Sequence, residues 1–281
     1  MAAPDFLVVG HVVKDIVPGG WRLGGTAAYA ALQAARLGLR AGVVTAAAPD
    51  LDLGSLAAEA QVHAVPSERS TTFENIYGPE GRTQYLRDRA CPLTAQDAPA
   101  EWRTAPVVLL GPVCGEVPPD MGSLFPGALA GVSAQGWLRR VGSDQRVRPC
   151  PWPRSRAWGK YDALFVSEED LMDDGSLLER WTVSFPVVAL TRAARGASLH
   201  QGGVWRHIEA FPEREVDPTG AGDVFAAAFL ALLAESGDVA EAARFASAAA
   251  AISVGAEGTT GIPTRAQVEE RLARHPEVVL R

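Results

Sequence analysis

The chain has 281 residues, of which 47% are hydrophobic and 21% charged, a composition that indicates a globular protein and excludes a disordered or fibrous one. Its formal net charge of −7 counts against a nucleic-acid partner, because nucleic-acid-binding surfaces are basic. The three cysteines lack metal-type spacing and are expected to be free thiols. The N-terminus lacks the pattern of a signal peptide, so we expect a cytoplasmic protein with no membrane partner.

The first part of the chain predicts a βαβ unit. A continuous apolar run at Phe6–Gly10 is typical of a strand buried in a parallel sheet. A stretch rich in glycine leads into a helix expected over residues 26–37, which ends at Gly38 in the position of a C-cap glycine. A second strand is predicted at Ala41–Thr45. Strand, helix and strand in this order imply a parallel sheet.

Two polar segments then break the pattern of buried strands. Residues 71–77 and 82–87 mix polar and apolar side chains and are joined by Gly78-Pro79-Glu80-Gly81, which suits a hairpin turn. They are too polar for the centre of a parallel sheet. We therefore expect a small β lid, built from about residues 12–23 and 71–88, that stands off a single domain spanning residues 1–281.

The rest of the chain completes an α/β pattern. Further strands are predicted at Val107–Leu110, Ala163–Val166 and Val187–Leu190, and a loop at 146–159, which holds Trp152 and Trp158. Residues 197–200 and 204–208 flank a Gln-Gly-Gly turn and predict another hairpin. Helices are expected at about 221–235, 240–254 and 265–275.

The strongest chemical signal is the string Val216-Asp217-Pro218-Thr219-Gly220-Ala221-Gly222-Asp223, which opens an apolar helix. Small residues at Gly220, Ala221 and Gly222 let backbone amides point to one place, and the helix start adds unpaired N–H groups, so together they predict an anion hole for phosphate. Asp223 is expected to be ionised, with a low pKa, and to accept the proton of an attacking hydroxyl. The alternative is a helix-start acid favoured by the dipole.

This string resembles the second signature of the ribokinase (pfkB) family of carbohydrate kinases, D-T-x-G-A-G-D, whose last Asp is the base. The segment from Leu23-Gly24-Gly25 to Leu37-Gly38 is similar to the family's N-terminal G-G-x-x-x-N-x-A…A-R-L-G. The resemblance implies a ribokinase-like α/β fold, with a central, mainly parallel sheet flanked by helices and a β lid, and ATP- and Mg²⁺-dependent phosphorylation of a small sugar or polyol. It also implies that Gly24 and Gly25 pass beneath the substrate and that Asp15 binds its hydroxyls, although the glycines alone also fit a tight turn.

Three departures from the family pattern bear on the site. Tyr29 stands where the family has Asn. Ser167-Glu168-Glu169-Asp170 replaces N-x-x-E, so Asp170 is implied to support Mg²⁺ through water, while Ser167 with the acids after it also fits a helix N-cap. Thr191 to Gly196 replaces T-x-G-x-x-G, and Thr191, Arg192 and Gly196 are still implied to contact ATP.

The resemblance implies further contacts. Gln135 and Arg139 are expected to bind substrate, against the alternative of a solvated loop. Thr219, Ser247 and Gly258 are expected near ATP, and Asp217 near a monovalent cation such as K⁺. A homodimer through the lid is also expected. Residues of the lid that either face the substrate or pack within the lid are Phe73, Asn75, Tyr77, Gln84 and Arg87.

Other functions remain open at this point. The chain has no P-loop string and no G-x-G-x-x-G after the first strand, which counts against a P-loop kinase and a dinucleotide-dependent dehydrogenase. A nucleoside or vitamin-type kinase of the same superfamily and a non-catalytic regulatory binding protein on the same scaffold are alternatives. The lid sequence and the stretch from Gln135 to Arg139 look more like the branch that contains myo-inositol kinases of archaea and plants.

Overall fold

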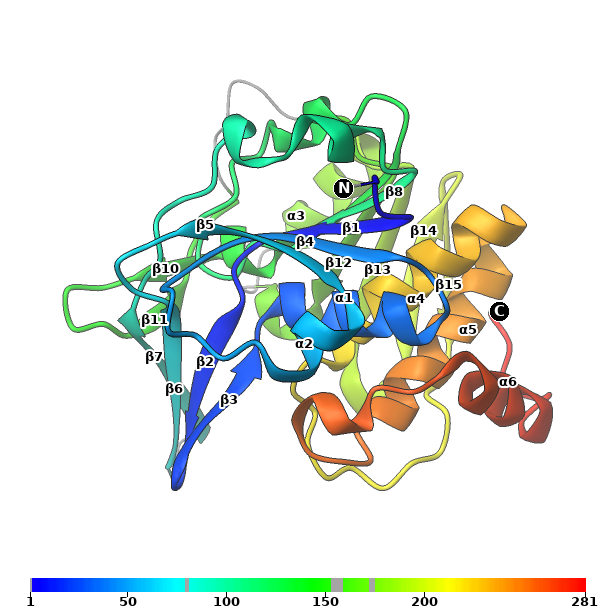
Figure 1. The fold of residues 1–281 in the computed structure, drawn as a ribbon. Coiled ribbons are helices and arrows are strands. Elements are labelled where there is room, and N and C mark those ends of the chain that lie inside the picture. The colour runs from blue at the N-terminus through cyan, green and yellow to red at the C-terminus, as the bar shows by residue number, and fades with distance from the viewer. Residues whose placement is uncertain (1, 79–80, 153–158, 172–174) are drawn as a thin grey trace.

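The structure, a computed structural model, describes residues 2–78, 81–152, 159–171 and 175–281. A nine-stranded sheet in the order β15-β14-β13-β12-β9-β8-β1-β4-β5 forms its centre (Figure 1). From β5 to β13 along this order neighbouring strands pair in parallel, whereas β14 pairs antiparallel with both β13 and β15. The strands are β1 Phe6–Val9, β4 Ala41–Ala47, β5 Gln61–Pro66, β8 Val107–Leu110, β9 Leu129–Ser133, β12 Ala163–Ser167, β13 Val187–Thr191, β14 Ala197–Gln201 and β15 Val204–Ile208.

Helices cover both faces of this sheet. The α-helices are α1 Thr26–Arg36, α2 Gly54–Glu59, α3 Gly175–Ser184, α4 Ala221–Ser236, α5 Val239–Ser253 and α6 Arg265–Arg274. Short 3₁₀ turns are η1 Ala95–Asp97, η2 Ala100–Thr104, η3 Met121–Leu124, η4 Ala134–Leu138, η5 Glu168–Asp170, η6 Ala193–Arg195 and η7 Gly258–Gly261. The helices predicted in the last third of the chain are present, with ends that differ by one residue. No helix within the described residues is both long and apolar enough to cross a bilayer.

The side-chain alternation of the strands divides the interior into two cores. Phe6 and Val8 of β1 pack with α1, α4 and α5, whereas Leu7 and Val9 pack on the opposite face with Trp102 and other aromatic side chains. Successive residues of a strand point to opposite faces, so a sheet covered on both sides needs an apolar side chain at every position. This is why the continuous apolar runs were a reliable signal of the buried strands.

A second, smaller sheet stands beside α1, at the lower left of Figure 1. Its four strands lie in the order β3-β2-β6-β7 and cover the two segments that the sequence predicts as a lid. The strands are β2 Val13–Val17, β3 Gly20–Gly24, β6 Thr71–Gly78 and β7 Gly81–Asp88. Residues 79–80 of the predicted turn lie outside the described residues.

A hairpin extends the edge of this second sheet. It consists of β10 Arg139–Val141 and β11 Val147–Pro149, and Leu86 of β7 donates its N–H to the carbonyl of Gln145 at 2.9 Å. The prediction of a loop over 146–159 was therefore wrong for 147–149, because three residues of mixed polarity carry too little pattern to indicate a strand. Residues 153–158, which include Trp158, lie outside the described residues.

A buried carboxylate fixes the place where the chain passes from one sheet to the other. Glu116 accepts backbone N–H groups from His11, Val113 and Cys114 at 2.8–3.1 Å. The His11 ring donates to the carbonyl of Cys91 at 2.9 Å through one nitrogen and pairs with the Thr71 hydroxyl through the other. Burial lowers the pKa of His11, which is consistent with a neutral, fully hydrogen-bonded ring.

Candidate active site

A cavity of about 900 Å³ lies at the carboxyl ends of the main-sheet strands, the usual place for ligands in open α/β sheets. Ser133, Ser167 and Thr191, the last residues of β9, β12 and β13, line it together with the second sheet, the start of α4 and part of α5. The structure brings most of the sequence-predicted site residues into its lining, namely Asp15, Gly25, Gln135, Arg139, Asp170, Thr191, Gly196, Thr219, Gly220, Ala221, Gly222, Asp223 and Ser247.

The glycine turn at the start of α4 is tightly built. Gly220 has a φ of 78°, and a Cβ there would lie 2.2 Å from Cδ1 of Tyr29, so no other residue fits. At Gly222, by contrast, a Cβ would meet no described atom within 4 Å. Asp217 fastens the turn, because its Oδ1 accepts the N–H of Thr219 at 3.0 Å. Gly220, Ala221 and Gly222 line the cavity, and the N–H of Ala221 donates to the carbonyl of Pro218 at 3.3 Å within the turn.

Asp223 faces this cavity from the first turn of α4 and is half-buried. Burial raises its pKa from 3.8 to about 6; a hydrogen bond from the Thr26 hydroxyl and the charge of Arg139 oppose this, while Asp170 and Asp15 add to it. The sequence-based expectation of a low pKa was therefore wrong, since desolvation outweighs the stabilising contacts. A carboxylate with a pKa near 6 is still mostly ionised at neutral pH and is a stronger base than an ordinary Asp.

The two glycines that are expected beneath the substrate, Gly24 and Gly25, are required by close packing around Asp15 and His11. Asp15 lies on β2, on the same face of the second sheet as its cross-strand neighbour Phe73. A Cβ on Gly24 would lie 2.0 Å from Oδ2 of Asp15, and a Cβ on Gly25, whose φ is 83°, would lie 2.7 Å from the carbonyl oxygen of His11. Gly24 therefore lies against Asp15 and makes room for its carboxylate, and it is not in the cavity lining.

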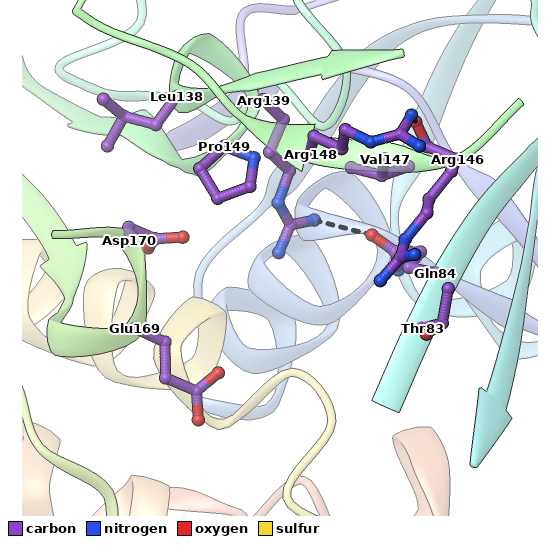
Figure 2. Close-up of a pocket in the computed structure, with 10 residues that line it drawn as sticks. All are labelled: Thr83, Gln84, Leu138, Arg139, Arg146, Val147, Arg148, Pro149, Glu169 and Asp170. Atoms are coloured by element: carbon purple, nitrogen blue, oxygen red, sulfur yellow. Dashed lines mark hydrogen bonds between the residues drawn. The ribbon is translucent and has the colours of Figure 1, made fainter. Parts of the chain in front are cut away.

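Gln135 and Arg139 approach the same end of the cavity from η4 and β10. The Gln135 side chain is hydrogen-bonded to Asp170, and Arg139 donates to Oε1 of Gln84 in the second sheet at 3.2 Å (Figure 2). Arg139 is close enough to lower the pKa of both Asp170 and Asp223. One cation thus lies close to two carboxylates that come from separate elements, Asp170 of η5 and Asp223 of α4.

The acidic segment after β12 is a capped turn. The Ser167 hydroxyl accepts the N–H of Glu169, and Oδ2 of Asp170 accepts the N–H of Ser167 at 3.1 Å, so the N-cap interpretation is present in the structure. Burial raises the pKa of Asp170. Glu169 and Asp170 both line the cavity, and such oxygen ligands suit Mg²⁺, which keeps several waters and takes one or two carboxylates.

The segment after β13 keeps the backbone shape of the family pattern without its first glycine. Ala193 has a φ of 49°, in the left-handed region that glycine favours, and it occupies the first glycine position of T-x-G-x-x-G. Gly196 has a φ of 84°, and a Cβ there would lie 2.0 Å from the carbonyl oxygen of Ile208. Arg192 does not line the cavity; its Nε lies 4.0 Å from Glu168, which also pairs with Arg195.

The far end of the cavity is apolar. Phe211 and Pro212 belong to its lining, together with Ala250, Ala251 and Val254 of the α5 region. Ser247 of α5 also lines the cavity and is buried, and its Oγ has no hydrogen-bond partner in the part of the chain that the structure describes. A buried hydroxyl without a partner is costly, which favours a ligand that completes its hydrogen bonding.

Asp217 and Gly258 are predicted site residues that do not line the cavity but support the turn before α4. Gly258, with a φ of 55°, donates its N–H to Oδ2 of Asp217 at 3.0 Å, and Arg22 of β3 lies 3.5 Å from the same oxygen. Gly258 therefore supports Asp217. It is not among the residues that line the cavity, although the sequence analysis expects it near ATP. A guanidinium already occupies part of the surroundings where Asp217 is expected to hold a monovalent cation.

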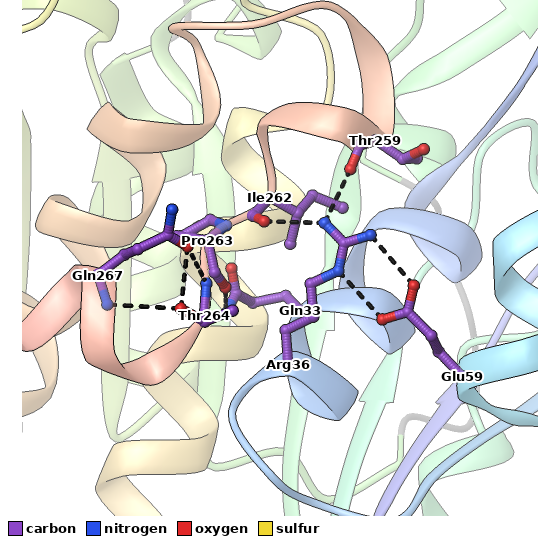
Figure 3. Close-up of polar contacts among 8 residues, drawn as sticks. All are labelled: Gln33, Arg36, Glu59, Thr259, Ile262, Pro263, Thr264 and Gln267. Atoms are coloured by element: carbon purple, nitrogen blue, oxygen red, sulfur yellow. Dashed lines mark hydrogen bonds and ion pairs between the residues drawn. The ribbon is translucent and has the colours of Figure 1, made fainter.

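The loop that carries Gly258 is clamped to α1. Arg36 donates to the carbonyls of Thr259 and Ile262 at 3.1 and 2.8 Å and forms a two-fold ion pair with Glu59 (Figure 3). Gln33 donates to the carbonyl of Pro263 at 3.3 Å. The arginine of the A-R-L-G segment thus has a structural role, because it connects the start of the chain to the loop behind Asp217.

Sequence reasoning missed several lining residues. Thr26, which hydrogen-bonds Asp223, lies at the start of the first predicted helix, where the motif assigns it no role. Ser133 lies at the end of β9, a strand that the apolar pattern does not delimit. In the second sheet Phe73, Asn75 and Gln84 line the cavity, whereas Arg87 pairs with Glu74. The Tyr77 side chain lies outside the described residues.

The chain is similar in sequence to known kinases, over part of its length or most of it. The family model described as pfkB family carbohydrate kinase matches residues 162–265. A ribokinase of Bacillus subtilis is 46% identical over 87 residues, and the match spans 30% of this chain and 29% of that protein. A cytidine kinase of Thermococcus kodakarensis is 28% identical over 259 residues, which cover 81% of this chain and 87% of the kinase.

Solved structures show the same fold over nearly the whole chain. A pyrophosphate-dependent kinase of the ribokinase family, complexed with a pyrophosphate analog and myo-inositol, superposes with a TM-score of 0.79 at 23% identity and covers 95% of this chain and 99% of that one. Arabidopsis thaliana ribokinase, complexed with ribose and ATP, gives a TM-score of 0.72 at 21% identity, with 96% and 99% covered. The chain therefore has the ribokinase-like α/β fold.

Proposed function

We propose that this chain, which carries a pfkB family carbohydrate kinase domain on a ribokinase-like fold, is an ATP-dependent kinase that phosphorylates a hydroxyl group of a small sugar or polyol. The observation that carries the proposal is Asp223, a half-buried carboxylate with a raised pKa at the start of α4, directly after a turn in which Gly220 tolerates no side chain. Base and anion hole are thus adjacent on one rigid element.

In the proposed reaction the acceptor hydroxyl attacks the γ-phosphorus of ATP. A new bond forms between the acceptor oxygen and phosphorus, the bond between phosphorus and the β–γ bridging oxygen breaks, and ADP leaves. Asp223 accepts the hydroxyl proton, and the N–H groups of the turn at Gly220–Gly222 stabilise the negative charge that develops on phosphate oxygens. Because Asp223 makes a hydrogen bond with Thr26, its carboxylate is held in one orientation.

Asp170 and Glu169 are the residues that would hold Mg²⁺, through one or more waters. When bound, the ion would neutralise phosphate charge. Asp170 is already oriented by the N–H of Ser167 and by Gln135, so the protein's contribution is a fixed carboxylate at the cavity wall. Asp217 is proposed as the K⁺-responsive residue, although the Arg22 guanidinium beside it lowers the need for a cation.

The apolar end of the cavity supports a nucleotide as the phosphoryl donor. Phe211, Pro212 and Ala250 offer flat apolar surface for a base, and Ser247 offers an unpartnered hydroxyl. Pyrophosphate would use none of these groups. Since a pyrophosphate-dependent kinase shares the fold, a donor test must include both compounds.

For the acceptor, we propose a cyclitol of the myo-inositol type, with a nucleoside as the second candidate. Asp15, Gln135 and Arg139 place an acceptor carboxylate, an amide and a guanidinium around one end of the cavity, which suits a compound with several hydroxyl groups. A fold neighbour was solved with myo-inositol, and a relative that matches most of this chain is a cytidine kinase. Tyr29, in place of the family Asn, closes the floor with an aromatic ring.

The proposal is tested by following phosphoryl transfer with ³¹P NMR, with ATP or pyrophosphate as donor and ribose, fructose, myo-inositol or cytidine as acceptor. We expect a phosphorylated acceptor and ADP in equal amounts, with ATP preferred. Loss of donor only to hydrolysis, or no turnover with any acceptor, would contradict the assignment. The Asp223→Asn variant controls for contaminating kinases.

The proposal extends to assembly and compartment. Ile16, Trp21 and Ile76 are exposed on the second sheet, which is the surface expected to form a homodimer. Sedimentation of wild type and Trp21→Glu would decide between dimer and monomer. All three cysteines are unpaired, which suits a reducing, cytoplasmic environment.

A further inference from the structure

A side cavity of about 500 Å³ opens beside the main one and is called the annex here (Figure 2). Gln84, Arg139, Glu169 and Asp170 line both spaces, so the annex is continuous with the end of the main cavity where the acceptor is proposed to bind. Its outer wall is the β10–β11 hairpin. A ligand that reaches Asp223 with one hydroxyl therefore has room to extend beneath the hairpin.

The hairpin concentrates positive charge in an acidic protein. Residues 139–149 contain four arginines and one acidic residue, Asp144, whereas the whole chain has a net charge of −7. Arg148 is bound by Asp144 through two contacts of 2.7 and 2.6 Å, so its charge is already paired. Arg146 also lines the annex, and no carboxylate in the described part of the chain pairs with its guanidinium.

Two guanidinium groups are aimed at one place. Figure 2 shows the side chains of Arg139 and Arg146 both running toward Gln84, whose carbonyl oxygen accepts a hydrogen bond from Arg139. The carboxylates of Glu169 and Asp170 lie on the opposite side, next to the main cavity. The annex thus has a cationic wall at the hairpin and an acidic wall toward the reacting groups. Arginine is suited to two-point binding of phosphate and carboxylate groups.

We infer that the acceptor carries an anionic substituent, a phosphate or carboxylate group, in addition to the hydroxyl that is phosphorylated, and that Arg146 with Arg139 binds this substituent in the annex. The inference rests on the proposed kinase function and narrows its substrate class to sugar or cyclitol phosphates and sugar acids. The acidic wall favours the neutral, hydroxylated part of the substrate near Asp170, and so sets its direction in the site.

The test compares matched acceptors that differ in the anionic group: ribose with ribose 1-phosphate, myo-inositol with myo-inositol 1-phosphate, and glucitol with gluconate. We expect the best acceptor to be an anionic one, and the phosphate and carboxylate pairs show which group is preferred. In Arg146→Gln the ratio of kcat/KM for the anionic to the neutral member should fall by about 10–150-fold, the range expected for a hydrogen bond to a charged group.

Arg140→Gln is the matched control, because Arg140 lies on the same hairpin, is exposed and does not line the annex. Its ratio should equal that of wild type. Preference for the neutral member in every pair, or an equal ratio in Arg146→Gln and Arg140→Gln, would overturn the inference and leave the kinase proposal intact.

Calorimetric binding of the same compounds without donor separates the two proposals. Anionic compounds that bind in an Arg146-dependent way but are never phosphorylated would support the annex and count against the kinase function. Anionic compounds that neither bind nor react would overturn the inference. A variant that fails to fold is recognised by its circular dichroism, and Arg146→Lys, which keeps the charge but loses two-point binding, then takes its place with a smaller expected fall.

Discussion

The turn and helix at residues 216–231 and the second sheet with its hairpin line the same cavity but are built on different principles. In the first, the groups at the cavity are backbone amides and one carboxylate on a contiguous segment, fixed by Gly220, Tyr29 and Asp217. In the second, side chains from β2, β6, β7 and β10 meet from four separate stretches of chain. In the proposed kinase, the part of the site that would handle phosphate is therefore compact in sequence, while the part that would select the acceptor is dispersed.

The largest expected effect is on kcat, and it comes from a substitution in the turn and helix at residues 216–231. Asp223→Asn keeps the shape and removes the proton acceptor, so kcat should fall by about 10²–10⁴-fold, the usual contribution of a general base. The Kd for ATP, measured by calorimetry, should change little. Near-wild-type turnover of the true acceptor would mean that Asp223 is only a helix-start acid, and the contrast between the two regions would lose its chemical basis.

Alanine substitutions at Gly220 and Gly222 compare a position where a Cβ would clash with one where it would meet no described atom. Gly220→Ala forces a Cβ into a left-handed backbone and against the Tyr29 ring, and we expect it to lower the free energy of unfolding by about 2–5 kcal/mol. Gly222→Ala meets no described atom, so its stability should stay within about 0.5 kcal/mol of wild type. Both are measured by urea unfolding. Equal losses would show that Tyr29 does not constrain the turn.

The same contrast explains what could be predicted from the sequence. Parallel strands buried on both faces are continuous apolar runs, and the helix after Asp223 is apolar on all sides, so β1, β8, β12, β13 and α4 were evident. β10 and β11 have three residues each and mixed polarity, and the sequence predicted a loop for one of them. Short elements of this kind are held by contacts with β7 that no local pattern reveals.

Electrostatics was the least predictable property of the site. The raised pKa of Asp223 depends on burial and on Asp15 and Asp170, which are far from it in sequence. Arg146 was part of a predicted loop, and its position at the annex follows from the pairing of β10 with β11. Residue type and local spacing indicate which groups carry the chemistry, whereas their charges at neutral pH require the tertiary structure.

A substitution in the second sheet should affect the acceptor alone. Asp15→Ala removes the proposed acceptor of substrate hydroxyl groups and would leave polar groups of the substrate unpaired, at a cost of about 1–3 kcal/mol. The kcat/KM for the best acceptor should fall by about 5–150-fold, while the Kd for ATP stays constant. If both change together, Asp15 supports the fold and the acceptor site lies elsewhere in the cavity.

The smallest expected effect is on the pH dependence of the free energy of unfolding, to which Asp223 contributes. The pKa of Asp223 is raised from 3.8 to about 6 in the folded protein, so folding favours the protonated form. The stability that it contributes is fully present below about pH 3.8 and is lost as the pH rises through 6. Because Asn does not ionise, Asp223→Asn does not lose stability as the pH rises. The variant should therefore be more stable than wild type at pH 8, and the difference should shrink as the pH approaches 4.

The size of this effect follows from the shift. A change of about two pKa units is worth at most about 3 kcal/mol, and because Asp223 keeps some contact with solvent we expect about 1–2 kcal/mol at pH 8. Urea unfolding of both proteins between pH 5 and 8 measures it, with Asp120→Asn, an exposed residue without a capping hydrogen bond, as control. A variant less stable than wild type at pH 8 would show that the hydrogen bond with Thr26 outweighs the burial of charge. The proposed role of Asp223 as a base stronger than an ordinary Asp would then lose its support, because the folded protein would favour the ionised carboxylate.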